Sequence, residues 1–230
     1  MDTVQCWLII SSVVGLILWL LLVNLHRVIH YNECQLILKN NSTVQLSRNG
    51  MYDNVLSVMS YNVNNMPTHI FVDKKQRLGR LQTFLKSQME RVDVFVFQEV
   101  FTKTYIDGLD KFFSEQNWSV LYADPKANYL TLANSGLFVA SRYEIKNAKG
   151  INFKDCDVLD CLSKKGAIRF SIEENGYKYI IVNTHLQDAT FDMTGAVRKS
   201  QLKQIKNDLV ENGTDAILGD LNASPGDIVF

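Results

Sequence analysis

The chain has 230 residues, a formal net charge of zero and a hydrophobic content of 47%. This hydrophobic content is ordinary for a globular domain that carries one extra apolar segment. Because there is no basic excess, the overall charge gives no support to a nucleic-acid-binding protein.

The first feature along the chain is an uncharged run over residues 7–25. At 1.5 Å per residue, roughly 19 helical residues reach about 28 Å, close to the hydrocarbon thickness of a bilayer. A cleaved signal peptide would have a basic N-terminal region, a shorter core and a small-residue cleavage site, and the flanks of this run offer neither the basic region nor the cleavage site. We therefore predict a retained, single-pass transmembrane helix within residues 1–30.

Two patterns disagree about the side of the membrane on which the rest of the chain would lie. Basic residues follow the run and none precedes it, which favours a cytoplasmic position for the C-terminal part. Sequons for N-glycosylation favour the opposite side, and they begin at Asn40, Asn41, Asn117, Asn212 and Asn222. The sequence leaves this side open.

A polar linker is predicted over residues 31–54, with a short strand at 34–38, and a soluble domain over residues 55–230. The linker is polar and weakly patterned, whereas apolar residues at helical spacing and buried apolar runs mark the domain. In the first half of the domain these patterns predict strands at 56–61, 92–97, 118–122 and 135–140, and helices at 75–91 and around 105–113.

The second half of the domain continues the alternation of strands and helices. Strands at 166–173 and 177–184 flank Asn175-Gly176, a dipeptide typical of a hairpin turn. A third helix stops near 212–213, and a short buried strand follows at 215–218. Together the elements predict a layered α/β domain with a mixed sheet.

Polar side chains follow four of the predicted strands. Asp220 and Asn222 are two residues apart, so on an extended backbone their side chains point the same way. A carboxylate and a carboxamide placed so can position a water and a phosphate oxygen beside a divalent cation, although the same residues also suit a plain turn. Ligand sites in α/β sheets collect at strand ends, which favours a site formed by these groups. The remaining strand ends carry Asn62, Gln98-Glu99 and Asn183 with His185.

At these residues the sequence resembles the endonuclease/exonuclease/phosphatase superfamily, also called DNase I-like, and within it the neutral and bacterial-type sphingomyelinases. The resemblance runs from about Leu56 to Asn222 in the order of the family. The matching segments lie at residues 60–63, 97–100, 134–137, 140–143, 161–167, 183–187 and 219–222. The Lys-Gly-Ala and His-Leu-Gln segments are the ones more particular to the sphingomyelinase branch.

The resemblance implies a four-layer α/β sandwich and a Mg²⁺ cofactor. Glu99 corresponds to the principal Mg²⁺ ligand of the family, and Asn62 completes the site directly or through water. Asp220 corresponds to the carboxylate that orients the attacking water. These roles agree with the chemistry, because hydrolysis of a phosphodiester needs an oxygen-ligated cation and an oriented water.

The resemblance also implies which residues bind the substrate. Asn222 and His185 correspond to groups that bind the scissile phosphate and stabilise its charge. Lys165 corresponds to the lysine of a Lys-Gly segment near the active site of the family, and a solvated loop pair with Lys164 is the alternative. The substrate implied is sphingomyelin in a membrane, cleaved to ceramide and phosphocholine.

One part of the family pattern does not match this sequence. Family members continue with more sheet and a Ser-Asp-His motif whose histidine is the general base. The histidines here are His26, His30, His69 and His185. We therefore expect an incomplete sandwich and weak or absent turnover, since a general base is typically worth about 10²- to 10⁴-fold in rate.

Two other functions compete with this reading. The chain could be another phosphodiesterase or a nuclease of the same superfamily, although the neutral charge argues against nucleic acid as a partner. It could also be a catalytically dead, membrane-anchored remnant that binds without turnover. The four cysteines lack metal-site spacing, and Cys156 and Cys161 are either a disulfide or two thiols.

Overall fold

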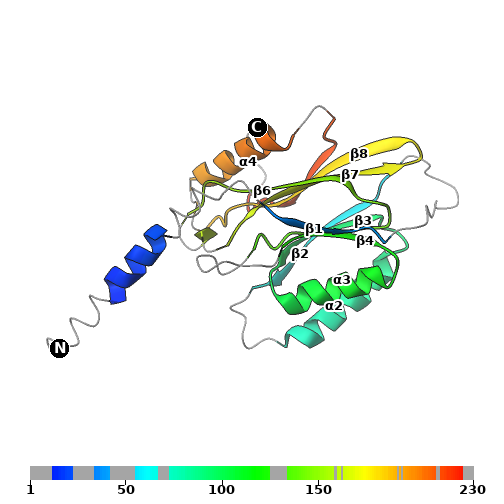
Figure 1. Cartoon of the computed structure of the whole chain (residues 1–230), viewed down its shortest axis with the longest axis horizontal. Coiled ribbons are helices and arrows are strands. Elements are labelled where there is room, and N and C mark those ends of the chain that lie inside the picture. The colour runs from blue at the N-terminus through cyan, green and yellow to red at the C-terminus, as the bar shows by residue number, and fades with distance from the viewer. Residues whose placement is uncertain are drawn as a thin grey trace.

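The computed structural model shows four packed layers, in the order helices, sheet, sheet, helix (Figure 1). Helices α2 (Lys74–Gln88) and α3 (Lys103–Ser114) cover the outer face of a five-stranded sheet. Helix α4 (Ala196–Asp208) covers the outer face of a four-stranded sheet. The structure describes residues 12–22, 34–41, 55–66, 73–124, 134–157, 160–161, 163–190, 192, 194–210 and 213–224.

The five-stranded sheet has the order β1-β4-β5-β3-β2. Strands β2 and β3 are parallel, and the other neighbours in this sheet are antiparallel. The strands are β1 (Leu36–Lys39), β2 (Val58–Asn65), β3 (Val94–Val100), β4 (Ser119–Ala123) and β5 (Phe138–Ser141).

The four-stranded sheet has the order β6-β7-β8-β9. Strands β8 and β9 are parallel and are joined through α4, and the other two pairs are antiparallel. The predicted hairpin turn is present, because Asn175 and Gly176 both have positive φ angles, of 49° and 80°. The strands are β6 (Lys146–Asn152), β7 (Gly166–Glu174), β8 (Tyr177–His185) and β9 (Ala216–Asp220).

Three apolar layers hold the four structural layers together. Aromatic side chains, including Phe95 and Phe113, fill the space between the five-stranded sheet and its helices. Aliphatic side chains such as Val96 and Ile168 fill the space between the two sheets. Leu202 and Ile205 of α4 pack on the outer face of the second sheet. The prediction of a layered α/β sandwich is therefore confirmed.

The sheet topology brings four strand ends to one place. The carboxyl ends of parallel strands lie at the same edge of a sheet, which applies to β2 with β3 and to β8 with β9. Strand β9 also contacts both β2 and β3 across the space between the sheets. Side chains at these four strand ends therefore converge between the two sheets.

Strand β6 was not predicted from the sequence. Its residues, Lys-Asn-Ala-Lys-Gly-Ile-Asn, lack the alternation of apolar and polar side chains that marks a half-buried strand. The register with β7 shifts between Lys146 and Lys149, and Asn147 has a φ of 51°. This irregularity breaks the two-residue period that sequence patterns detect.

The predicted transmembrane helix, and with it the membrane localisation, is corrected by the structure. The part of this run that the structure describes, residues 12–22, is helical. No helix among the described residues is long and apolar enough to cross a membrane. The rest of the predicted span, at residues 7–11 and 23–25, lies outside the described residues, as does most of the predicted linker.

Candidate active site

Glu99 lies within β3 rather than after its end, and its backbone is unusual. Its φ angle is 61°, in the left-handed region that non-glycine residues rarely adopt. If side chains alternated strictly along β3, Glu99 would point toward helices α2 and α3, as Phe97 does. The left-handed turn instead brings Glu99 to the side that faces the second sheet. Gly136 packs closely against this turn, since a Cβ there would lie 2.6 Å from the ring of Phe101 and 3.1 Å from the Cα of Glu99. A bulge in the register of β2 and β3 accompanies the turn.

Asn62 joins two carboxylates from different sheets. Its Nδ2 donates hydrogen bonds to Glu99 Oε1 at 2.9 Å and to Asp220 Oδ2 at 2.8 Å. Its Oδ1 accepts from the backbone N–H of Asn64 at 2.8 Å, so in this orientation the amide nitrogen faces the carboxylates. Glu99 and Asp220, 121 residues apart in the sequence, are therefore neighbours.

Asp220 and Asn222 occupy the end of β9. The backbone N–H of Asn222 donates to Asp220 Oδ1 at 3.0 Å, and its Nδ2 donates to the carbonyl oxygen of Leu186 at 3.0 Å. Burial alone would raise the pKa of Asp220, but the hydrogen bonds from Asn62 and Asn222, with the positive charge of Lys165 acting in the same direction, lower it below its usual value. Asp220 is therefore an ionised acceptor at neutral pH.

His185, at the end of β8, is a neutral imidazole. Burial lowers its pKa to about 4, and the positive charge of Lys165 acts in the same direction. The ammonium of Lys165 lies 3.4 Å from His185 Nε2 and, having no acceptor, can only donate to that nitrogen. The same Nε2 lies 4.0 Å from Glu99 Oε1, so the imidazole stands between the lysine and the carboxylate.

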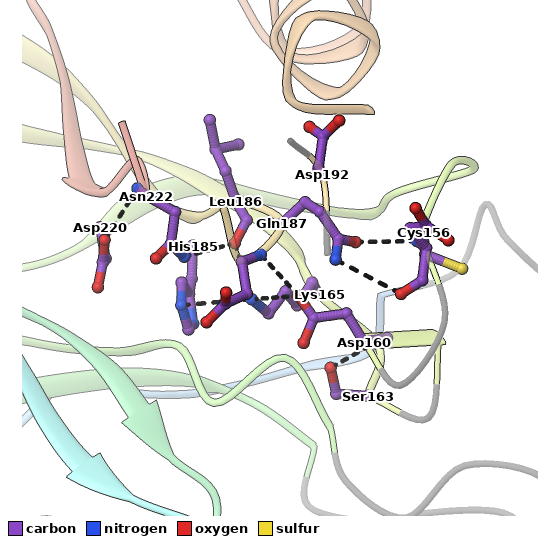
Figure 2. Close-up of polar contacts among 12 residues, drawn as sticks. Cys156, Asp160, Ser163, Lys165, His185, Leu186, Gln187, Asp192, Asp220 and Asn222 are labelled. Carbon is purple, nitrogen blue, oxygen red and sulfur yellow. Dashed lines mark hydrogen bonds and ion pairs between the residues drawn. The ribbon is translucent and has the colours of Figure 1, made fainter. Parts of the chain in front are cut away.

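Lys165 is buried, and one of the residues that hold it, Asp160, was not connected to the site by the sequence. Its Nζ donates to the carbonyl oxygen of Leu186 at 2.7 Å and pairs with Asp160 Oδ2 at 2.8 Å (Figure 2). Asp160 lies between Cys156 and Cys161, which form a disulfide. The family resemblance covered residues 161–167 and so included Lys165, but it gave no role to Asp160.

Two residues at the predicted polar strand ends, Gln98 and Asn183, have a structural role. Gln98 and Asn183 are at most 1% exposed and bond to each other across the sheets, with Nε2 of Gln98 donating to Oδ1 of Asn183 at 2.8 Å. Asn183 also donates to the carbonyl oxygen of Phe97 at 3.0 Å. These amides satisfy each other and the backbone, so they fix the distance between the sheets below the site.

The residues at this edge fit a hard divalent cation. Glu99 Oε2 is buried and forms no hydrogen bond with any described residue. Together with Asp220 it concentrates negative charge around one amide nitrogen. No group of three or more histidine, cysteine, aspartate or glutamate side chains in the described part of the chain is placed to cage a metal. Mg²⁺ is commonly bound by one or two carboxylates, waters and substrate phosphate oxygens, which this site can offer.

Comparison with known proteins gives one curated relative and several solved structures. No protein-family model matches the chain. Sphingomyelinase C 2 of Leptospira interrogans is 24% identical over 196 residues, which are 73% of this chain. The chain spans only 30% of the length of that relative.

Solved structures with the same fold include a sphingomyelinase, a beta toxin and TDP2. Sphingomyelinase C of Streptomyces griseocarneus is 23% identical with a TM-score of 0.61, over 75% of this chain and 66% of that one. A beta toxin mutant of Staphylococcus aureus with bound magnesium ions is 23% identical with a TM-score of 0.59, over 74% and 65%. TDP2 of D. rerio, complexed with a single-stranded DNA product, is 18% identical with a TM-score of 0.56, over 75% and 62%. The predicted resemblance to the endonuclease/exonuclease/phosphatase superfamily is thereby confirmed, and at these identities the solved structures bear on the fold alone.

Proposed function

We propose that the chain is a Mg²⁺-dependent phosphodiesterase that hydrolyses sphingomyelin to ceramide and phosphocholine. The observation that supports this proposal is the convergence of polar groups from four strands between the two sheets. Two carboxylates, two carboxamides, one neutral imidazole and one ammonium meet there, and the first carboxylate has an unpartnered, buried oxygen. This combination provides for a cation, a water and a phosphate together.

In the proposed mechanism Glu99 would hold Mg²⁺, and its buried Oε2, which has no described hydrogen-bond partner, is available for this role. Asn62 would complete the site beside Glu99, directly or through a water, and its hydrogen bonds to Glu99 and Asp220 keep the two carboxylates together. The ion, when bound, neutralises charge on the phosphodiester and on the leaving oxygen. Asp220 accepts a hydrogen bond from the attacking water and so orients it, a role for which its lowered pKa keeps it ionised.

The proposed phosphate-binding groups are Asn222, His185 and Lys165. Asn222 offers a carboxamide N–H from the end of β9, close to Asp220. The ammonium of Lys165, held against His185, supplies a positive charge. Its attraction to the phosphoryl group would grow as negative charge develops on that group. The Asp160 carboxylate keeps this lysine in place while partly balancing its charge.

The sphingomyelin headgroup is the part of the proposal that rests on likeness to other proteins. The curated relative carries the name sphingomyelinase, and the Lys-Gly-Ala and His-Leu-Gln segments lie at Lys165 and His185, inside the site. DNA is the other phosphodiester to consider, given the likeness to TDP2. The net charge of zero does not favour DNA, since DNA binding depends on neutralising phosphates.

The test is a comparison of three phosphodiesters with the full chain. Phosphocholine release would be measured from vesicles of sphingomyelin and of phosphatidylcholine, and nicking would be measured on plasmid DNA, each with Mg²⁺ and with chelator. We expect slow release from sphingomyelin that requires Mg²⁺ and exceeds release from phosphatidylcholine. Cleavage of DNA with sphingomyelin untouched would contradict the substrate, and no Mg²⁺-dependent cleavage of any of the three would contradict the activity.

A further inference from the structure

A cavity lies on the opposite face of β2 from the candidate active site. Neighbouring residues of a strand point to opposite faces, so Asn62 faces the second sheet while Tyr61 and Val63 face helices α2 and α3. The cavity has a volume of about 250 Å³. It is lined by Tyr61, Val63, Arg77, Arg80, Leu81, Phe84 and Tyr105.

The cavity contains two cations with unused donors. The guanidinium of Arg77 donates to the backbone carbonyl oxygens of Val63 and Asn64, and that of Arg80 donates to Gln76. A guanidinium has five N–H donors, so both arginines retain donors for a ligand. Neither arginine forms an ion pair with a described carboxylate.

The helix that carries both arginines has a one-sided charge. Helix α2 has five basic residues and no acidic one, although the whole chain has a net charge of zero. No acidic residue of this helix balances the positive potential at the cavity. This potential favours the binding of an anion there. The basic residues are Lys74, Lys75, Arg77, Arg80 and Lys86.

Tyr105 supplies a further polar group to the wall of the cavity. This residue is only 1% exposed, and its hydroxyl is buried without a hydrogen-bond partner among the described residues. A buried hydroxyl without a partner is unfavourable, and such groups are uncommon in folded proteins. Burial raises the pKa of Tyr105 while the charges of Arg77 and Arg80 act against this rise, so the hydroxyl lies within their electrostatic reach. An oxygen of an anion bound to the arginines would satisfy it.

The remaining walls are apolar and aromatic. The rings of Tyr61 and Phe84 have centroids 5.9 Å apart, and each residue is about 40% exposed. Val63 and Leu81 complete this apolar side. We propose that the cavity binds a phosphate group carried on an apolar or aromatic body, with Arg77, Arg80 and the hydroxyl of Tyr105 on the phosphate and the two rings against the body.

The proposal can be tested without any turnover at the other site. Binding of phenyl phosphate would be measured by calorimetry, and binding to phosphatidylcholine vesicles with and without phosphatidic acid by co-sedimentation, all with chelator present. The chelator removes divalent cations, so the first site cannot bind the phosphate through a metal. We expect saturable binding of phenyl phosphate or of the phosphatidic acid vesicles, and the ligand that binds identifies the source as soluble or lipid.

Three variants distinguish binding in this cavity from nonspecific attraction to the positive charge of helix α2. Arg80→Gln should weaken binding about tenfold or more, because a charge-assisted hydrogen bond is lost. Tyr105→Phe should weaken it severalfold while leaving the melting temperature unchanged or higher, since the hydroxyl has no protein partner. Lys86→Gln is the matched control, because it removes a charge from the same helix outside the cavity. The proposal would be overturned if neither ligand bound saturably. Equal losses of binding in Arg80→Gln and Lys86→Gln would also overturn it.

Discussion

Replacement of Glu99 by glutamine should lower Mg²⁺-dependent phosphodiester hydrolysis by about 10³-fold or more. The change keeps the volume of the side chain and an acceptor for the amide of Asn62, but it removes the charge that Oε2 offers to a cation. Loss of a catalytic metal removes several kcal/mol of charge stabilisation, and each ~1.4 kcal/mol is tenfold in rate. The measurement is the initial rate of phosphocholine release at saturating Mg²⁺.

The control for this variant is Glu90→Gln, which removes an exposed carboxylate just after α2. It should leave the rate unchanged. The melting temperature of Glu99→Gln should equal or exceed that of the parent chain, because the substitution relieves repulsion between Glu99 and Asp220. A rate within a few-fold of the parent would show that Glu99 is not the metal ligand, whereas a large fall in melting temperature would show a structural role instead.

Replacement of Gly219 by alanine should prevent the second sheet from forming correctly. Gly219 has a φ of 140°, and a Cβ at this position would lie 1.9 Å from the carbonyl oxygen of Thr184 in the neighbouring strand. Backbone must move to relieve such a contact, so we expect a loss of more than about 4 kcal/mol, a large share of a typical domain's stability. Denaturant unfolding measures this loss.

Gly176→Ala provides a matched comparison for backbone conformation alone. Gly176 also has a positive φ, of 80°, but a Cβ there would meet nothing within 4 Å. This variant should lose only about 1–2 kcal/mol, the usual cost of a left-handed conformation for a residue with a side chain. Equal losses in the two variants would show that the close approach of β8 and β9 is not what requires Gly219.

Much of the fold could be predicted because local patterns and tertiary structure agree. Leu78 and Leu85, at helical spacing, are buried in α2, and the apolar run before Gln98 is the fully buried part of β3. The strand β6 could not be predicted, because its irregular register removes the local signal. The apolar run at residues 7–25 predicted a membrane span, whereas no helix in the described part of the chain is long and apolar enough to cross a membrane.

The site could be predicted only in part, for a different reason. The sequence places Asn62, Asp220 and His185 near strand ends, and parallel pairing then brings those ends together. The position of Glu99 depends on a left-handed turn against which Gly136, 37 residues later, packs closely. The contact of Asp160 with Lys165 likewise depends on tertiary structure around the disulfide loop. Such contacts leave no periodic pattern in the sequence.

Binding of Mg²⁺ to the edge between the sheets tests the central claim most directly, because it depends on neither the substrate nor the rate. The unfolding free energy of the parent chain and of Glu99→Gln would be measured with increasing Mg²⁺. For the parent chain we predict a gain that reaches about 2.7 kcal/mol when Mg²⁺ is at one hundred times its dissociation constant. Glu99→Gln should show little or no gain, and Glu90→Gln should behave as the parent. An equal gain in Glu99→Gln, or no gain in the parent, would contradict the account.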